Sequence, residues 1–576
     1  MNLYLKEYFL VLGESKYRVP LLVSYFIFSS LLDVFGLSLV AIYIPLIIGD
    51  FSFLPQSFIN SYLDAGYKLS DAYIYLGILI IFVYAIKSVI SFDIQKRIIR
   101  FSLGVELNLR DRLMKAYISK PYSFYLIENS SNIINNIGIY ANTFQTSTVN
   151  ASLKFLAEAL VIISIILLVF ISNPIFTISI ALLIASFFFL FDYLVKDKIL
   201  KAGETASFRF GNVINLVNQT IFGIKEVKIF NREEFFQEKL RNEVIIVNEA
   251  RYIQDSMKLI PRYAIEFLLV MATILMAVIM QYLGVEKTTI LSSVAVFVVA
   301  GTRLMPSSNV LITSLTALRA GRFVVSELSK TLERNEEEIQ KIDHEFDETE
   351  QLKWKNEIQF KEIYFKYKDS EKYLFDGVSF DIRRGESIGI IGESGSGKTS
   401  LVNILLNLLD TEKGEVYVDG KNYDKKRHVI QNSMAYIPQN IFLLDDTIEK
   451  NIAFGSKKHE INPDLLNNAI RKSRLDDLVN SLPDGINTKI GERGIRFSGG
   501  QQQRIAIARA LYSDREILIL DEATSALDDI TEKEIVNEIE SLKGKLTIIV
   551  IAHRLSTLEA CDRIISVDQG KLVEKK

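Results

Sequence analysis

A glycine-rich stretch at residues 392–399, GESGSGKT, combines residue types that bind phosphate groups. Glycines let backbone N–H groups close around phosphate oxygens, the lysine can reach the outer phosphates, and the threonine hydroxyl is a ligand for Mg²⁺. An apolar strand pattern, SIGII, precedes the stretch and an apolar helical pattern follows it. This is the context that a phosphate-binding P-loop requires, so we predict nucleotide phosphates and Mg²⁺ at this loop. The predicted contacts are Gly392, Ser394, Gly395, Ser396, Gly397, Lys398, Thr399 and Ser400.

Two carboxylates follow a second apolar strand pattern, ILIL, at Asp521 and Glu522. Open parallel sheets bind ligands at the carboxyl ends of their strands, so both side chains are expected near the P-loop. Asp521 would hold Mg²⁺ through water. Glu522 would polarise the attacking water as a general base.

Further motifs of the same chain segment resemble those of one protein family and occur in that family's order. FSGGQQQR at 497–504 is similar to the signature sequence of ATP-binding-cassette proteins, YIPQN to their Q-loop, SALD to their D-loop and IAHRLST to their switch-histidine segment. The resemblance covers 357–576 and implies ATP hydrolysis. It implies that Tyr367 stacks on adenine, that Gln439 contacts Mg²⁺ and the attacking water, and that His553 holds the γ-phosphate. The expected catalytic residues are Glu522, His553 and Gln439, and the expected metal ligands are Thr399, Gln439 and Asp521.

The signature segment of ATP-binding-cassette proteins acts across a dimer. The resemblance therefore implies that two cassettes sandwich two ATP molecules, each signature facing the other subunit's P-loop. Because no motif is degenerate, we expect a homodimer in which both sites hydrolyse ATP. The expected nucleotide contacts in the signature are Ser498, Gly499, Gly500 and Gln501.

The first 320 residues are far more apolar than the rest, and the chain is 49% hydrophobic overall. About 20 apolar residues of helix cross a bilayer. Long basic connections alternate with short ones that carry only Lys68 and Lys287, so the long connections, both termini and the cassette are expected in the cytosol. We predict a multi-pass protein of the inner (cytoplasmic) membrane. The six predicted spans lie near 20–48, 72–92, 150–172, 175–195, 264–283 and 289–318.

The polar stretches between the spans keep apolar positions at helical spacing, which indicates helices that continue beyond the membrane. A charge-rich stretch then predicts a linker before the cassette. We expect an all-α transmembrane domain of six helices at 1–330, a linker at 331–356, and an α/β P-loop nucleotide-binding domain with a helical subdomain at 357–576.

One short loop narrows the class. GERG at 491–494 is similar to a loop of exporters of this family. The resemblance implies alternating access, with coupling helices near 121–127 and 212–223 that rest on the cassettes. A net charge of −3 without blocks of like charge argues against a nucleic-acid partner, and the single Cys561 excludes an intramolecular disulfide.

Three basic residues in or next to the predicted spans stand out, because a charge at bilayer depth costs at least about 2.5 kcal/mol. They are Lys87, Arg262 and Arg303. In one interpretation Arg262 reaches the headgroups, while the other two pair with Asp33, Glu158 or Glu266. In the other, the three cations bind an anionic substrate headgroup such as a phosphate or diphosphate. Both remain open from the sequence.

The membrane segments also resemble bacterial flippases of lipid-linked oligosaccharides, on the stretches FVVAGTRLMPSSNVLITSL, LIPRYAIEF and RFSLG. This resemblance implies ATP-driven flipping of a polyprenyl-diphosphate-linked oligosaccharide to the outer leaflet. The alternative is a general exporter of lipids such as lipid A, of drugs or of peptides. Pro306, three residues after Arg303, cannot donate to the Thr302 carbonyl, so the last helix is expected to bend or loosen there.

Overall fold

The computed structural model describes residues 2–48, 69–172, 174–342, 352, 354–368, 370–424, 427–522, 533, 536–537, 540–551, 558 and 561–575. They form two compact units. The first comprises Met1–Lys120 and Glu128–Ile342, and the second comprises Pro121–Ile127 and Asp343–Lys576.

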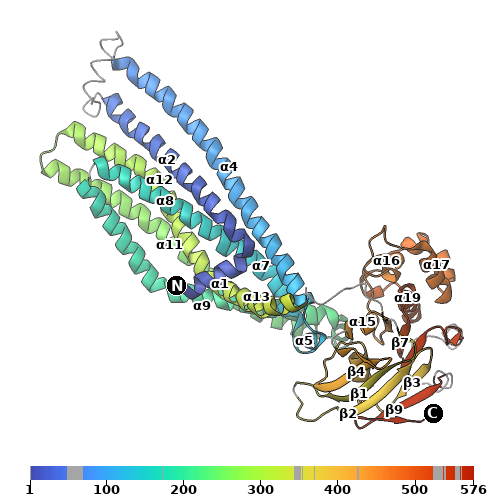
Figure 1. The fold of residues 1–576 in the computed structure, drawn as a ribbon. Helices are drawn as coiled ribbons and strands as arrows, with labels where there is room; N and C mark the ends of the chain where they lie inside the picture. Colours follow the sequence, from blue (N-terminus) through green and yellow to red (C-terminus); the bar gives the residue numbers. More distant parts are fainter. Residues whose placement is uncertain are drawn as a thin grey trace. The chain divides into compact units, whose positions relative to one another are not determined.

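The first unit consists of helices, several of them very long (Figure 1). Its elements are α1 (Asn2–Leu12), η1 (Gly13–Arg18), α2 (Val19–Ile48), α4 (Leu69–Ile118), α6 (Ser130–Ile134), η2 (Asn135–Tyr140), α7 (Ala141–Thr143), η3 (Phe144–Val149), α8 (Asn150–Ser172), α9 (Pro174–Phe222), α10 (Ile224–Ile229), α11 (Glu233–Tyr282), α12 (Lys287–Ala320) and α13 (Arg322–Ile342).

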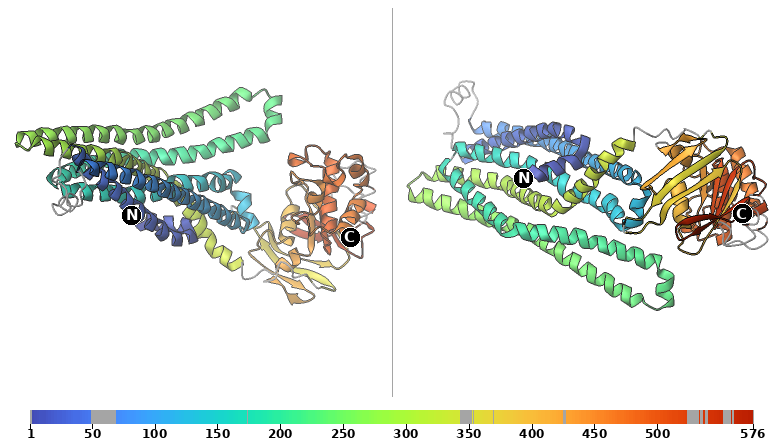
Figure 2. Two further views of the ribbon diagram at one scale, coloured as in Figure 1. Left: turned by 90° about the horizontal axis from the view of Figure 1, so that it is seen from above. Right: turned by 60° about the horizontal axis from the view of Figure 1, so that its bottom comes forward.

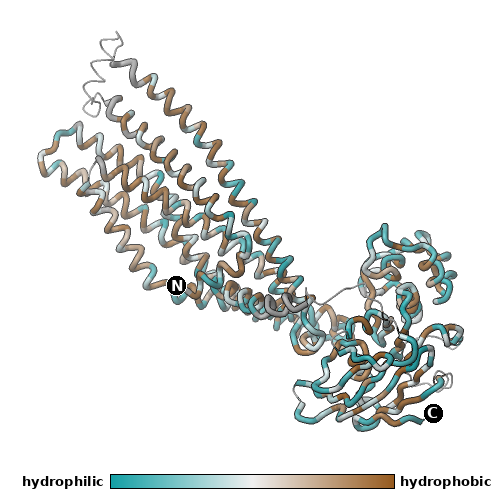
Figure 3. The backbone as a smooth tube through the Cα atoms, viewed as in Figure 1, coloured by the Kyte–Doolittle hydropathy of each residue, from teal (hydrophilic) through white to brown (hydrophobic). Residues whose placement is uncertain are grey.

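Six helices among the described residues are long and apolar enough to cross a membrane, which confirms the predicted number of spans. Figure 3 shows long hydrophobic stretches in these helices, together with hydrophilic ones. The helices α4 and α11 have 50 residues each, about 75 Å at 1.5 Å per residue, so they exceed a hydrocarbon core of about 30 Å. The prediction of helices that continue past the membrane is confirmed.

The helices α9 and α11 lie side by side as a long hairpin that α10 closes (Figure 2). Residues 212–223, expected to form a separate coupling helix, are instead the end of α9 and the turn that follows it. The helices α9 and α11 pack along each other, and α9 continues to Phe222, the residue before Gly223. The separate short helix is α10, whose register the sequence interpretation missed.

The helix α13 packs on α1 and extends to Ile342, so residues 331–342 of the expected linker are helical. Leu328 and Leu332 are buried in a core with α1 and α4, and this burial carries the helix into the charged stretch. The helices α11, which contains Pro261, and α12, which contains Pro306, are each continuous helical elements.

The second unit contains two sheets and a set of short helices. Its strands are β1 (Glu357–Phe365), β2 (Phe375–Arg383), β3 (Ser387–Ile391), β4 (Lys413–Val418), β5 (Lys421–Asn422), β6 (Met434–Ile437), β7 (Ile517–Asp521), β8 (Thr547–Ile551), β9 (Arg563–Asp568) and β10 (Lys571–Glu574). Its helices are α5 (Tyr122–Ile127), α14 (Lys398–Leu405), α15 (Arg427–Gln431), α16 (Ile448–Ile452), α17 (Pro463–Lys472), α18 (Asp476–Ser481), η5 (Gly485–Asn487), η6 (Glu492–Gly494) and α19 (Gly499–Tyr512).

The larger sheet has the order β10-β9-β3-β8-β7-β6, and its strands from β9 to β6 are parallel. Every residue of β7 and β8 is buried, as expected for strands covered on both faces. One face packs on α14 and on the antiparallel sheet β2-β1-β4-β5, and the other packs on α19. A separate core joins α16, α17 and α19 into a helical subdomain. The expected α/β domain with a helical subdomain is confirmed.

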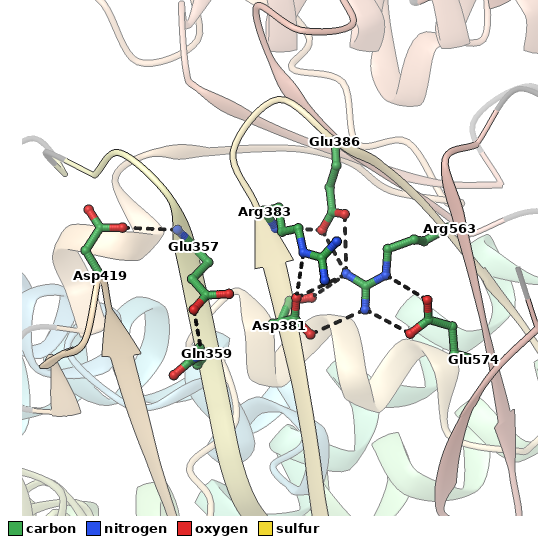
Figure 4. Close-up of polar contacts among 8 residues, drawn as sticks. All are labelled: Glu357, Gln359, Asp381, Arg383, Glu386, Asp419, Arg563 and Glu574. Carbon is green, nitrogen blue, oxygen red and sulfur yellow. Dashed lines mark hydrogen bonds and ion pairs between the residues drawn. The ribbon is translucent and has the colours of Figure 1, made fainter.

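Charged residues tie the strands of this unit together (Figure 4). The Arg563 side chain on β9 is 11% exposed and contacts Asp381 on β2, Glu386 before β3 and Glu574 on β10. Asp419 accepts three backbone N–H groups, at 2.7 to 3.0 Å, from Lys355 and the next two residues. These bonds fix the path of the chain where it enters β1.

Packing of the second unit begins before the predicted boundary at residue 357. Leu352 and Trp354 are buried in its core, and the indole N–H of Trp354 donates to Glu516 at 2.7 Å. The end of the expected linker is therefore part of the folded unit.

Candidate functional site

The motif residues gather at the carboxyl ends of neighbouring parallel strands. The P-loop follows β3, Asp521 ends β7 and Glu522 comes directly after it, and Gln439 comes two residues after β6. The sheet order places β8 between β3 and β7. Ligands bind at this edge of open parallel sheets, as the sequence interpretation requires.

The P-loop backbone needs its glycines. Gly392, Gly395 and Gly397 have φ angles of 156°, 81° and 106°, which disfavour other residues. A Cβ at Gly392 would lie 2.5 Å from the hydroxyl of Ser396 and 2.5 Å from the carbonyl of Val567. The loop then enters α14, whose N-terminal N–H groups can bind phosphate oxygens.

Lys398 folds back on its own loop. Its Nζ donates to the carbonyls of Gly392 at 2.7 Å and Glu393 at 2.9 Å, and the residue is 8% exposed. A phosphate oxygen that replaced these carbonyls would form a charge-assisted bond. Thr399 and Ser394 are exposed, so their hydroxyls are open to a ligand.

Two serines near the loop are buried to different effect. The hydroxyl of Ser396 is buried and has no partner among the described residues. Ser400 lies 2.8 Å from the hydroxyl of Tyr367, with which it shares a hydrogen bond. This bond holds the Tyr367 ring, which also packs edge-on against Phe365, close to the start of α14. The expected aromatic partner of adenine is thus connected to the P-loop helix.

The carboxylate of Asp521 is 5% exposed and accepts a hydrogen bond of 3.1 Å from Tyr436 on β6. Burial, together with the charge of Glu522, raises the pKa of Asp521 above its usual value, although Tyr436 and Lys398 act against this rise. The sequence interpretation missed Tyr436. Its only signal was its position within the YIPQN motif, three residues before Gln439.

Glu522 and Gln439 contact each other directly. The amide of Gln439 donates to Glu522 at 2.6 Å, and the backbone N–H of Glu522 donates to Ile551 on β8 at 3.0 Å. Glu522 has a φ of 50°, a left-handed conformation that is strained for a residue with a side chain. The backbone therefore directs this carboxylate to the Q-loop at some energetic cost.

The signature segment begins α19. Ser498 caps the helix in a reciprocal capping box with Gln501, and both Ser498 and Gly499 are exposed. Because the Ser498 oxygen serves as an acceptor for Gln501 N–H, its hydroxyl proton is available to an outside acceptor. Gly500 follows within the first turn, where backbone N–H groups lack helical partners. His553 and the D-loop residues 525–528 lie outside the described residues.

The membrane unit brings two of its three predicted cations to one carboxylate. Lys87 on α4 and Arg303 on α12 both contact Asp33 on α2, the latter at 3.0 Å. Asp33 is therefore the partner that the sequence left undecided between three acids. Arg262 is exposed and lies over the ring of Tyr263, apart from this pair.

A cavity of about 700 Å³ lies between α8, α9, α11 and α12 of the membrane unit. Its lining is mainly apolar, and Glu266 is the one charged residue among those described there. Thr302 and Leu304 of α12 line the cavity, whereas Arg303 between them contacts Asp33 on α2. The helix α12 therefore has an apolar compartment on one side and a charged cluster on another.

Comparisons with known proteins agree with this arrangement. Residues 23–298 match the ABC transporter transmembrane region, and residues 375–525 match the ABC transporter family. An ATP-dependent lipid A-core flippase of Burkholderia orbicola is 30% identical over 480 residues, which cover 81% of this chain and 78% of that protein. A flippase of the same name from Francisella novicida is 29% identical, with 87% of this chain and 84% of that protein covered.

A solved structure described as a bacterial Atm1-family ABC exporter with ATP bound shares the fold. Its TM-score is 0.76 at 20% sequence identity, with 96% of this chain and 94% of that chain covered.

Proposed function

From the premise that this chain belongs to the ABC transporter family, as a helical transmembrane region fused to one ATP-hydrolysing cassette, we propose that it moves an anionic lipid across the bilayer. It is a multi-pass membrane protein that couples ATP hydrolysis to transport. The lipid substrate, the direction of movement and the residues that act are our proposal.

The observation that carries the substrate proposal is the meeting of Lys87 and Arg303 at Asp33. Two cations at one carboxylate leave a net positive charge within an apolar helical unit. A net charge at bilayer depth is costly, so its presence favours a functional role, and phosphate groups bind such cations well. The apolar cavity on the other side of α12 suits the hydrocarbon part of an amphipathic molecule.

The named relatives favour lipid A among anionic lipids. They are flippases of lipid A-core that match this chain over most of its length. The polyprenyl-linked oligosaccharide, our leading expectation from the membrane stretches, is therefore less well supported than the alternative. We propose a phosphorylated glycolipid of the lipid A type as the substrate and the polyprenyl diphosphate as its rival.

The nucleotide chemistry follows from the geometry of the cassette. Lys398 would exchange the carbonyls of its loop for phosphate oxygens, and Tyr367 would stack on adenine. Glu522 would then take the proton of the attacking water, which Gln439 orients beside it. Thr399, Asp521 and Gln439 offer the hydroxyl, buried carboxylate and amide oxygen that suit Mg²⁺. When bound, Mg²⁺ would neutralise charge on the phosphates.

The complete site needs a second subunit. The exposed start of α19 offers donors to a phosphate, and in a homodimer it would face the partner's P-loop. Closure of two cassettes on ATP would be passed to the membrane helices through α5 and α10. In support of this role, Pro121–Ile127 groups with the cassette unit rather than with the helices that flank it.

The test is reconstitution of the full chain in proteoliposomes with three fluorescent probes. These are a lipid A-type glycolipid with phosphates, a polyprenyl diphosphate oligosaccharide and a hydrophobic dye without charge. We expect ATP-dependent movement of the glycolipid and none with Glu522→Gln. Preference for the oligosaccharide would establish the rival substrate, and equal movement of the uncharged dye would reject an anionic lipid as the cargo.

A further inference from the structure

Asp33 is the buried member of a charged cluster, which we define as Asp33, Lys87 and Arg303. The side chain of Asp33 is 1% exposed, whereas those of Lys87 and Arg303 are 15% and 35% exposed. The carboxylate thus lies behind the cations, which keep the more open side of the cluster. An anion that approaches from that side meets positive groups and does not have to displace Asp33.

The cluster has unused hydrogen-bond donors. Arg303 contacts Asp33 through Nη2 at 3.0 Å, and its side chain is 35% exposed, so other N–H groups of the guanidinium are open to a ligand. A guanidinium carries five N–H donors and an ammonium carries three, more than one carboxylate can accept. A headgroup phosphate can therefore bind the cations while Asp33 keeps its own contacts.

The cluster is also fixed in position by its neighbours. The Lys87 ammonium lies 4.8 Å from the centre of the Tyr84 ring, and a Cβ at Gly36 would lie 3.2 Å from that ring. Gly36 is one helical turn after Asp33 on α2. The absence of a side chain at Gly36 lets Tyr84 approach α2 and support the lysine. The two cations come from helices far apart in the sequence, and their contacts with Asp33 hold them side by side.

We propose that Asp33 lowers the affinity of this cluster for an anionic headgroup. The two cations alone would carry two positive charges, and Asp33 reduces the net charge to one. In a low-dielectric membrane interior such a change strongly alters the attraction for an anion a few ångströms away. A transporter has to release its substrate after moving it, so a lower affinity for the headgroup favours turnover. This inference rests on the proposed function, because it assumes an anionic lipid at the cluster.

The experiment measures ATPase activity of the full chain in phosphatidylcholine nanodiscs with increasing phosphatidic acid, or with diacylglycerol of the same acyl chains. The quantity compared is the phosphatidic acid concentration that gives half-maximal stimulation. Asp33→Asn should lower this concentration about tenfold, because the cluster then carries two positive charges. It should also lower the maximal rate, because the headgroup is released more slowly. An unchanged or raised concentration would overturn the proposal.

Asp33→Asn leaves two cations without a carboxylate, which can impair folding of the variant. The test therefore needs a comparison that does not rely on this variant alone. A second comparison avoids this problem. Lys87→Met should raise the half-maximal concentration, because its cluster is neutral. Addition of Asp33→Asn to Lys87→Met restores one net positive charge and should return the concentration toward the wild-type value. Equal responses of Lys87→Met and the double variant would also refute the role of Asp33.

Asp192→Asn is the matched control. It removes the carboxylate from another arginine–aspartate pair of this unit, between Asp192 on α9 and Arg319 on α12. Its half-maximal concentration should equal that of the wild type; a shift like that of Asp33→Asn would reduce the effect to general loosening of the helices. If the wild type does not distinguish phosphatidic acid from diacylglycerol, the proposed function fails and the inference fails with it. A wild-type preference with no difference between Lys87→Met and the double variant overturns the inference alone.

Discussion

At the scale of single residues, the two neighbouring acids of the cassette, Asp521 and Glu522, have different surroundings. Asp521 is buried and bound by Tyr436, whereas Glu522 is held by Gln439 and by a left-handed backbone. One carboxylate is thus suited to a cation and the other to a water molecule near the Q-loop. Neighbouring residues with the same functional group can take different roles when their environments differ, as we propose for Asp521 and Glu522.

Glu522→Gln should lower the steady-state rate of ATP turnover by about 10²- to 10⁴-fold, because an amide cannot take a proton from water. ATP binding should persist, since the P-loop is unchanged. Phosphate release and binding of a labelled nucleotide measure the two properties separately. Glu393→Gln, which alters an exposed P-loop carboxylate, is the control and should retain activity. Rapid turnover by Glu522→Gln would exclude this residue as the general base.

Tyr436→Phe should move the acidic limb of the pH–activity profile to higher pH. Burial already raises the pKa of Asp521, and the Tyr436 hydrogen bond opposes that rise, so its loss raises the pKa further. Protonated Asp521 cannot bind a cation, hence activity would fall at a higher pH as the solution is acidified. ATPase assays at saturating nucleotide and Mg²⁺ from pH 5 to 9 report the midpoint. Tyr423→Phe, a partly buried tyrosine of the same unit, should leave it unchanged.

At the scale of elements, the strands of the cassette depend on one arginine. Arg563 joins β2, β9, β10 and the turn before β3 through three acids (Figure 4). These strands do not all pair directly, so the side chain connects the antiparallel sheet to the edge of the parallel one.

Arg563→Met should lower the stability of the cassette unit by about 3 kcal/mol, because three acids lose a mostly buried partner. Calorimetry of the full chain should show a lower midpoint for the transition that nucleotide binding shifts. Arg563→Lys keeps the charge but loses the planar fork, and its midpoint should lie between those of the wild type and Arg563→Met. Equal midpoints for all three proteins would show that the network contributes nothing to stability.

At the scale of the whole molecule, the proposed substrate contacts and the nucleotide motifs belong to separate compact units. Arg303→Ala should therefore abolish stimulation by an anionic lipid and leave basal ATPase activity largely intact. The two rates, measured with and without lipid in the same nanodiscs, separate a lost substrate contact from a damaged cassette. Arg319→Ala, at the other arginine of α12 that pairs with an aspartate, is the matched control and should keep its lipid stimulation. Loss of basal activity in Arg303→Ala would contradict this separation.

The sequence by itself determined the nucleotide motifs, the six spans and the two-part fold. Each of these is a local pattern, because a P-loop is contiguous along the chain and a span is a run of apolar residues long enough to cross a bilayer. The three membrane cations could also be identified from short stretches of sequence. The register of the hairpin turn was not, because packing of α9 on α11 decides where the helix ends. Nor was the helical end of α13, which burial of Leu332 carries into a charged stretch.

Only the tertiary structure decided which groups meet. Three acids were available to the membrane cations, and the packing of α2, α4 and α12 brought Lys87 and Arg303 to Asp33, the latter from 270 residues away in the sequence. The order of the parallel strands likewise brought Tyr436 to Asp521 from 85 residues away. Long-range contacts of this kind depend on helix crossings and strand order, which no single stretch of sequence contains. The electrostatics of both sites follow from these contacts.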